Sequence, residues 1–215
     1  MSGAGTGPSP RALVALALCA ALSVAGATLA AGCGATGAET AAEPAAGAPA
    51  PTAPADPLVA WRVVYGVLQH PRCVNCHPAG DAPLQGDSQL PHGQLVQRGP
   101  DGRGLFALRC ENCHQPTNLP GEHLPPGTPN WHLPHPEMPL VFEGRSSAEL
   151  CRQIQDPARN GHKSLEELYA HMASDPLVLW GWDPGPGRTP IPVPHADLLA
   201  ALRAWIDAGC ACPEP

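Results

Sequence analysis

The sequence contains few aromatic residues and few charged ones. Trp, Tyr and Phe make up 4% of the 215 residues, and Asp, Glu, Lys and Arg together make up 14%. The 12 Lys and Arg residues are dispersed and form no basic run, which argues against a nucleic-acid partner. The formal net charge is −7, so the surface is expected to be acidic, as it is in many soluble proteins.

The scarcity of large side chains also limits the hydrophobic core that the chain can build. Pro and Gly are abundant instead, with 29 and 23 residues. Residues 1–55 are mostly Ala, Gly and Pro, whereas residues 56–215 hold all the His and Trp and are enough for one domain or two small lobes. A buried porphyrin would supply the missing apolar mass, so the composition fits a haem protein.

Residues 1–32 have the parts of a secretion signal. Arg11 precedes an apolar run from Ala12 to Ala31, and small residues end the run before Cys33. These small residues resemble the bacterial lipobox, in which the Cys becomes the acylated first residue of the mature protein. We therefore expect a lipoprotein signal peptide, lipidation at Cys33 and a periplasmic or extracytoplasmic location on a membrane. An uncleaved membrane anchor and ordinary cleavage with a free Cys33 are the alternatives.

Residues 33–55 form a low-complexity Ala/Pro-rich stretch without hydrophobic periodicity. Such a stretch is expected to be an extended tether, because it contains nothing from which to build a core. The folded domain is then expected over residues 56–215, held near a membrane while able to reach its partners.

Two C-x-x-C-H motifs occupy residues 73–77 and 110–114. Two thiols at this spacing can form thioether bonds to the vinyl groups of one porphyrin, and the next residue, His, falls under the iron as proximal ligand. A Cys₄ zinc site is the main alternative, and a disulfide within each pair is another. The His after each pair and the export signal favour haem. The residues expected to hold two haem c groups are Cys73, Cys76, Cys110 and Cys113 as anchors, with His77 and His114 as iron ligands.

The second motif has a recognisable context. Phe106 stands four residues before Cys110, Met138-Pro139 follows, and a helix with a Ser-x-x-Glu capping box is expected over Ser146–Gln155. This order resembles the class I cytochrome c module over residues 102–156. The resemblance implies a cytochrome c-like fold in which Met138 is the distal ligand of the second haem.

Met138 has an alternative role, which is simple packing in a Pro-rich loop. In that case His132 and His135 are the distal candidates for the second haem.

The first motif has no Met-Pro pair after it, so its distal ligand is expected among the histidines. His92 is the first candidate, because it lies in a Pro/Gly-bounded loop that can fold back over the haem of His77. His171 is the second candidate, on the apolar face of a helix expected over Leu165–Met172 with its own capping box. His70 is a further possibility as a ligand of the neighbouring haem.

The fold class expected from these patterns is mostly α with extensive irregular Pro/Gly-rich loops. A helix is expected over Pro57–Gln69, capped by Asp56, and another over His195–Ala208, ended by Gly209. Residues 115–143 have neither helical nor strand periodicity and are expected to be irregular. The first helix is expected to bury one face, formed by Leu58, Trp61, Tyr65 and Leu68.

Three cysteines remain near the end of the chain: Cys151, Cys210 and Cys212. In an oxidising compartment a bridge from Cys151 to Cys212 or to Cys210 would pin the last helix to the helix at Ser146. Because the number is odd, the sequence leaves the pairing open.

Much of the chain from His70 onward also resembles two-haem proteins known as isoquinoline 1-oxidoreductase subunits. The resemblance rests on residues 70–81, on residues 156–161 and on Trp180-Gly181-Trp182. It implies a redox partner protein, a molybdenum hydroxylase, as electron donor. The function expected is electron transfer between a redox enzyme and a downstream acceptor. A two-haem peroxidase or oxidase and a gas sensor, each with one open iron, are the alternatives.

Overall fold

The structure is a computed structural model and describes residues 53–215. The expectations for the signal peptide, for lipidation at Cys33 and for most of the tether lie outside these residues. The helices of the described part are α1 (Pro57–Leu68), α2 (Pro71–Val74), α3 (Ser147–Gln155), α4 (Leu165–Ser174), α5 (Pro176–Leu179) and α6 (His195–Asp207). Its strands are β1 (Leu84–Gln85), β2 (Leu90–Pro91), β3 (Gly104–Leu105) and β4 (Leu108–Arg109), and 3₁₀ turns cover Gly93–Leu95 and Cys110–Asn112.

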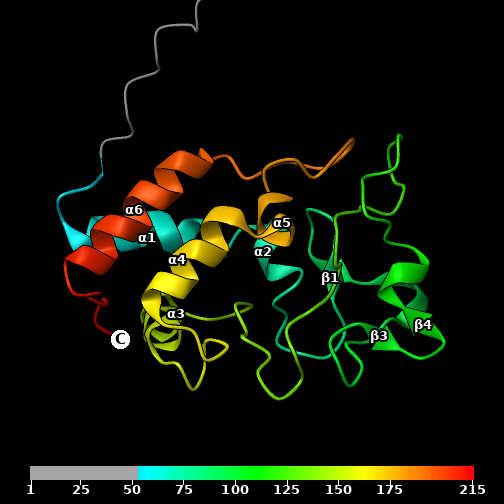
Figure 1. The fold of residues 1–215 in the computed structure, drawn as a ribbon, viewed down its shortest axis with the longest axis horizontal. Helices are drawn as coiled ribbons and strands as arrows, with labels where there is room; N and C mark the ends of the chain where they lie inside the picture. The colour runs from blue at the N-terminus through cyan, green and yellow to red at the C-terminus, as the bar shows by residue number, and fades with distance from the viewer. Residues whose placement is uncertain (1–52) are drawn as a thin grey trace, which may run out of the picture. The chain divides into compact units, whose positions relative to one another are not determined.

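The core lies between α1 and α6, which pack along each other (Figure 1). Trp61 of α1 and Trp205 of α6 are fully buried, and their ring centroids lie 5.0 Å apart. α3 covers α1, and α4 covers α6. Because a buried Trp removes a large apolar area from water, this pair compensates for the low aromatic content of the chain.

The predicted helix starts are confirmed, because their signals are local. The Asp56 carboxylate accepts a hydrogen bond from the N–H of Leu58 at 2.8 Å and so caps α1. α3 and α4 both begin with the expected capping box. The expected buried face of α1 is wrong in one residue: Leu58 is 37% exposed, since the buried side of the helix is centred on Val64 and Val67.

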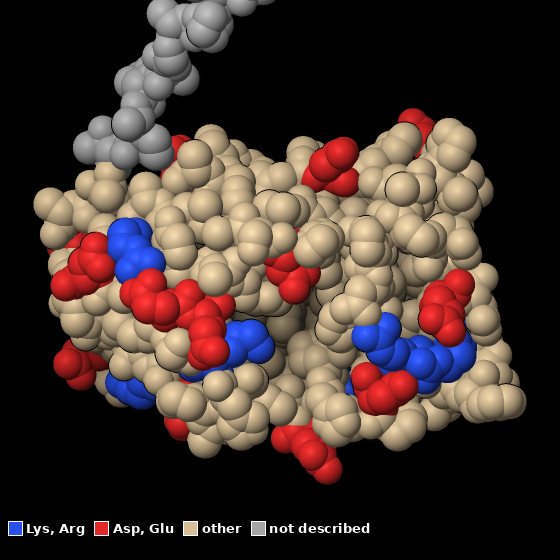
Figure 2. Space-filling view, in the orientation of Figure 1, with Lys and Arg blue, Asp and Glu red and all other residues tan. Residues whose placement is uncertain are grey.

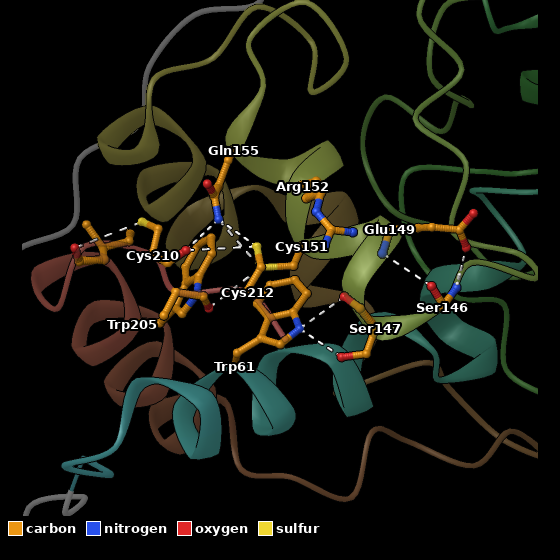
Figure 3. Close-up of a disulfide and its surroundings, with 12 residues drawn as sticks. Trp61, Ser146, Ser147, Glu149, Cys151, Arg152, Gln155, Trp205, Cys210 and Cys212 are labelled. Atoms are coloured by element: carbon orange, nitrogen blue, oxygen red, sulfur yellow. Dashed lines mark hydrogen bonds between the residues drawn. A yellow bond between two sulfur atoms is a disulfide. The ribbon is translucent and has the colours of Figure 1, made fainter. Parts of the chain in front are cut away.

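A disulfide joins Cys151 of α3 to Cys212, beyond the end of α6 (Figure 3). Of the two pairings that the sequence leaves open, this is the one in the structure, and Cys210 is a buried free thiol. The Gln155 amide donates to the Cys210 carbonyl at 2.5 Å, and the Trp205 indole donates to the Ala211 carbonyl at 2.9 Å. The chain end is therefore fixed to α3 and α6 by both covalent and hydrogen bonds.

The remaining half of the described chain is irregular and carries short two-stranded hairpins (Figure 1). Residues 115–143 contain neither helix nor strand, as expected. Buried Arg98 holds this half together, because its guanidinium donates to the Pro134 carbonyl at 2.7 Å and to the Gly80 carbonyl at 3.0 Å. Gly102 has a φ of +78°, and a side chain there would strike the Leu133 carbonyl, so only Gly fits.

The charged side chains on the face drawn in Figure 2 lie in small mixed clusters. An ion pair joins two helices: the Arg203 guanidinium on α6 makes two hydrogen bonds of 2.7 Å to the Glu166 carboxylate on α4. Between residues 53 and 215, every helix is too short or too polar to cross a bilayer.

Candidate functional site

The two C-x-x-C-H motifs have the same local backbone arrangement. The His77 N–H donates to the Cys73 carbonyl at 3.2 Å, and the His114 N–H donates to the Cys110 carbonyl at 2.9 Å. The first motif begins in α2, and the second begins in the 3₁₀ turn that follows β4. Each motif is therefore coiled into one turn that keeps its two cysteines and its histidine together.

His77 is held by a distant segment of the chain. Its Nδ1 lies 2.8 Å from the Leu140 carbonyl oxygen, and its ring stacks on Phe142 with centroids 3.9 Å apart. A carbonyl oxygen only accepts, so Nδ1 carries the proton and Nε2 keeps its lone pair. Metal-bound histidines in proteins are oriented in this way, by donating the other ring N–H to a carbonyl or carboxylate.

His114 has the same arrangement with other partners. Its Nδ1 lies 2.7 Å from the Pro126 carbonyl oxygen, so Nε2 is again the nitrogen with the lone pair. Its ring stacks on Trp131 at 4.3 Å and 5°, and Trp131 in turn contacts Trp180 edge to face at 5.0 Å. Both motif histidines thus have one ring nitrogen fixed and the other available.

Burial keeps both imidazoles neutral. Burial lowers the pKa of His77 to about 4, although the bond to Leu140 opposes the shift. Burial also lowers the pKa of His114, the bond to Pro126 opposes this, and the nearby His92 lowers it further. The neutral ring is the form that binds a metal, so both side chains are suited to ligation at neutral pH.

The four motif cysteines are free thiols, so neither pair forms a disulfide. Burial raises the pKa of Cys73 to about 12 and that of Cys76 to about 11, and the neighbouring Cys110 contributes to the shift at Cys76. Cys76 and Cys110 also line the same cavity, so the two motifs lie near each other although more than thirty residues of chain separate them.

A cavity of about 660 Å³ opens at the second motif. This volume lies in the range of about 300–1,000 Å³ that is typical of ligand sites. Cys110, Cys113 and His114 line the cavity, and Cys76 of the first motif reaches it as well. Its apolar wall is formed by leucines that are exposed to it and to solvent, among them Leu90, Leu108 and Leu124.

Three arginines line the same cavity: Arg72, Arg109 and Arg188. Arg72 is buried and ion-paired with Asp87, and its Nε has no hydrogen-bond partner in the structure. An unpaired buried donor is costly, and a guanidinium is the side chain best suited to a carboxylate. An apolar wall with cationic groups fits a porphyrin with its two propionates, so the residues present fit haem c.

His92 lies at a different motif from the one expected. The sequence pattern assigned it to the haem of His77, whereas the structure places it in the cavity of the second motif, with its ring centroid 6.1 Å from that of His114. The reason is the β1–β2 hairpin, in which the His92 N–H donates to the Pro83 carbonyl at 2.9 Å and so directs the following residues to that cavity.

Met138 is half-buried and does not line the cavity at His114. Its N–H donates to the His135 carbonyl at 2.9 Å, and two residues later the Leu140 carbonyl holds His77. The segment that carries Met138 is therefore attached to the first motif.

His171 and His132 are both close enough to His77 for their charges to lower its pKa, after the larger effect of burial. His171 of α4 contacts the Asp175 carboxylate through Nδ1 at 3.2 Å, and His132 donates through Nδ1 to the Asn130 carbonyl at 2.6 Å. His70 is instead occupied as the cap of α2, with its Nδ1 accepting the Arg72 N–H at 3.2 Å.

Phe106 differs from what the resemblance to a class I module implies. It lies in the turn between β3 and β4, and 98% of its surface is exposed. The aromatic contacts of the motif histidines come instead from Phe142 and Trp131, which lie after both motifs in the sequence. The carbonyls of Leu140 and Pro126 have no sequence signal beyond their irregular, Pro-rich surroundings. Trp131 and Phe142 do have one, because they are scarce aromatic residues that need burial.

Comparison of the chain with protein-family models, with curated proteins and with solved structures found no match. Among residues 53–215, no three His, Cys, Asp or Glu side chains are gathered as a site for a free metal ion.

Proposed function

We propose that this protein is an exported two-haem c-type cytochrome that transfers electrons between a redox enzyme and a downstream acceptor. The observation that carries the proposal is the shared geometry of the two motifs. In each, two free thiols precede a half-buried, neutral His whose Nδ1 is held by a backbone carbonyl. Haem c would supply a one-electron iron couple at each motif.

The residues of the chain have separate roles in this function. Cys73 and Cys76 anchor one haem, and Cys110 and Cys113 anchor the other. His77 and His114 are the proximal ligands, and the carbonyls that accept from their Nδ1 atoms keep Nε2 free for iron. The shared cavity supports electron transfer within one unit, because Cys76 of the first motif and Cys110 of the second both line it.

The test is to produce the full chain in a periplasm that contains the cytochrome c maturation system. We expect two covalently bound haems per chain by mass spectrometry and haem-stained gels. The pairs Cys73→Ala/Cys76→Ala and Cys110→Ala/Cys113→Ala should each lose one haem. Cys210→Ser, a change at a buried free thiol outside the motifs, should keep both. A colourless protein that binds zinc would overturn the proposal.

The partner proposed for electron entry is a molybdenum hydroxylase, which follows from the resemblance to isoquinoline 1-oxidoreductase subunits. Stopped-flow mixing of the oxidised protein with a reduced hydroxylase should show haem reduction.

The proposal of a lipid anchor is tested separately: Cys33→Ala should move the protein from the membrane fraction to the soluble periplasmic fraction.

A further inference from the structure

We propose that His92 is the distal ligand of the haem at Cys110–His114, so that this iron is bound by two histidines. The inference rests on the proposed function, because it requires a haem at this motif. His92 stands at the end of the β1–β2 hairpin and reaches the cavity that Cys110, Cys113 and His114 also line.

The separation of the two rings fits an iron between them. A metal–imidazole bond is about 2.0–2.1 Å long. A five-membered ring with bonds of about 1.33 Å has a radius of about 1.1 Å. Two imidazoles on opposite sides of one iron therefore have centroids a little over 6 Å apart by these values. The centroids of His92 and His114 are 6.1 Å apart.

The ring nitrogens of His92 are also arranged for ligation. Its Nδ1 lies 2.8 Å from the Gly93 carbonyl oxygen, so Nδ1 is the protonated nitrogen and Nε2 keeps its lone pair. His114 has the same arrangement with the Pro126 carbonyl. The two rings that face this cavity thus have the same nitrogen available.

The backbone after His92 is held in an unusual conformation. Gln94 and Leu95 both have φ near +55°, in the left-handed region that residues with side chains rarely adopt. Such conformations persist where the surrounding structure requires them, and they cluster at ligand sites. Here the turn follows the carbonyl of Gly93 that accepts from His92.

The cavity offers one other histidine, His123, which serves as a matched control. His123 is exposed, whereas His92 is half-buried and its ring lies near that of His114. Met138 is a second control, because it lies outside the residues that line the cavity.

The experiment uses the full chain with Cys73→Ala and Cys76→Ala, which isolates the haem at His114. Covalent haem is counted by mass spectrometry, and the spin state is read by absorption and electron paramagnetic resonance. We expect His92→Ala to keep the haem but to become fully high-spin, and added imidazole to restore the low-spin form. His123→Ala and Met138→Ala should leave the low-spin spectrum unchanged.

His92→Met provides a second test if the Ala variant does not mature. It should keep a six-coordinate iron and raise its reduction potential, because a Met/His iron has the higher potential. A low-spin spectrum that survives His92→Ala, or that is lost in His123→Ala or Met138→Ala, would overturn the assignment. A chain without covalent haem would instead overturn the proposed function.

Discussion

Phe106 and Phe142 are the only phenylalanines of the chain, and they occupy opposite environments. Phe106 is 98% exposed at a hairpin turn, whereas Phe142 is 4% exposed and stacks on His77. Sequence context favoured Phe106, because an aromatic residue ahead of the haem motif matches the class I order. The structure gives the aromatic contact at the second motif to Trp131 instead, and Phe142 supplies the one at the first motif.

We expect Phe142→Ala to lower the free energy of unfolding by about 3–5 kcal/mol, the cost of removing a buried Phe side chain. Phe106→Ala should change it by less than about 0.5 kcal/mol, as an exposed substitution does. Urea unfolding followed by far-ultraviolet circular dichroism measures both. Equal effects of the two variants would contradict the burial difference.

At the scale of elements, the disulfide between Cys151 and Cys212 joins α3 to the end of the chain over a sequence separation of 61 residues. A bridge that closes a loop of this length restricts the unfolded chain and contributes about 4 kcal/mol in the chain-entropy model. Cys151→Ser/Cys212→Ser should therefore lose stability of this order in urea unfolding. Reductant should destabilise the original protein and leave the double variant unchanged.

The start of α4 allows a second test at this scale. The Ser164 hydroxyl accepts from the Glu167 N–H at 3.3 Å, and the Glu167 carboxylate accepts from the Ser164 N–H at 2.8 Å. Ser164→Ala should cost about 1 kcal/mol of stability, since it removes the cap. Ser174→Ala, at the exposed end of the same helix, should have less than half this effect in the same urea titration.

At the scale of the whole molecule, several carboxylates stabilise the folded state in their charged form. The Ser164 N–H lowers the pKa of Glu167, the Ser146 N–H lowers that of Glu149, and the Arg203 guanidinium lowers that of Glu166. A lowered folded-state pKa gives stability that is present above the ordinary Glu value of 4.5 and is lost as the pH falls through the folded-state values.

We therefore expect the urea midpoint to fall first as the pH drops through about 6.5, because the unfolded chain then protonates histidines such as His77 that stay neutral in the fold. It should fall further below pH 4.5, the ordinary Glu value. Glu166→Gln and Glu167→Gln together should make that acid dependence shallower, because fewer carboxylates then take up protons on unfolding. An acid dependence as steep as that of the original protein would show that these carboxylates do not contribute to it.

Local chemistry explains what the sequence alone determined. The cysteines and histidines of the two C-x-x-C-H motifs lie within five residues of one another, and the helix starts depend on residues three or four positions apart, such as Ser146 and Glu149. The confirmed starts of α1, α3, α4 and α6 belong to this class. The mostly irregular half was also predictable, because Pro and Gly remove the periodicity that helices and strands need.

Only the tertiary structure decided which distant segments meet each motif. It brought His92 to His114, attached the segment of Met138 to His77 and paired Cys151 with Cys212. Each of these outcomes depends on the path of a Pro/Gly-rich loop or of the chain end. Such segments lack the hydrophobic periodicity of a helix or strand, so their paths cannot be read from the sequence. The two C-x-x-C-H motifs are equivalent in sequence, and their surroundings differ because long-range contacts, and not the motifs, select their partners.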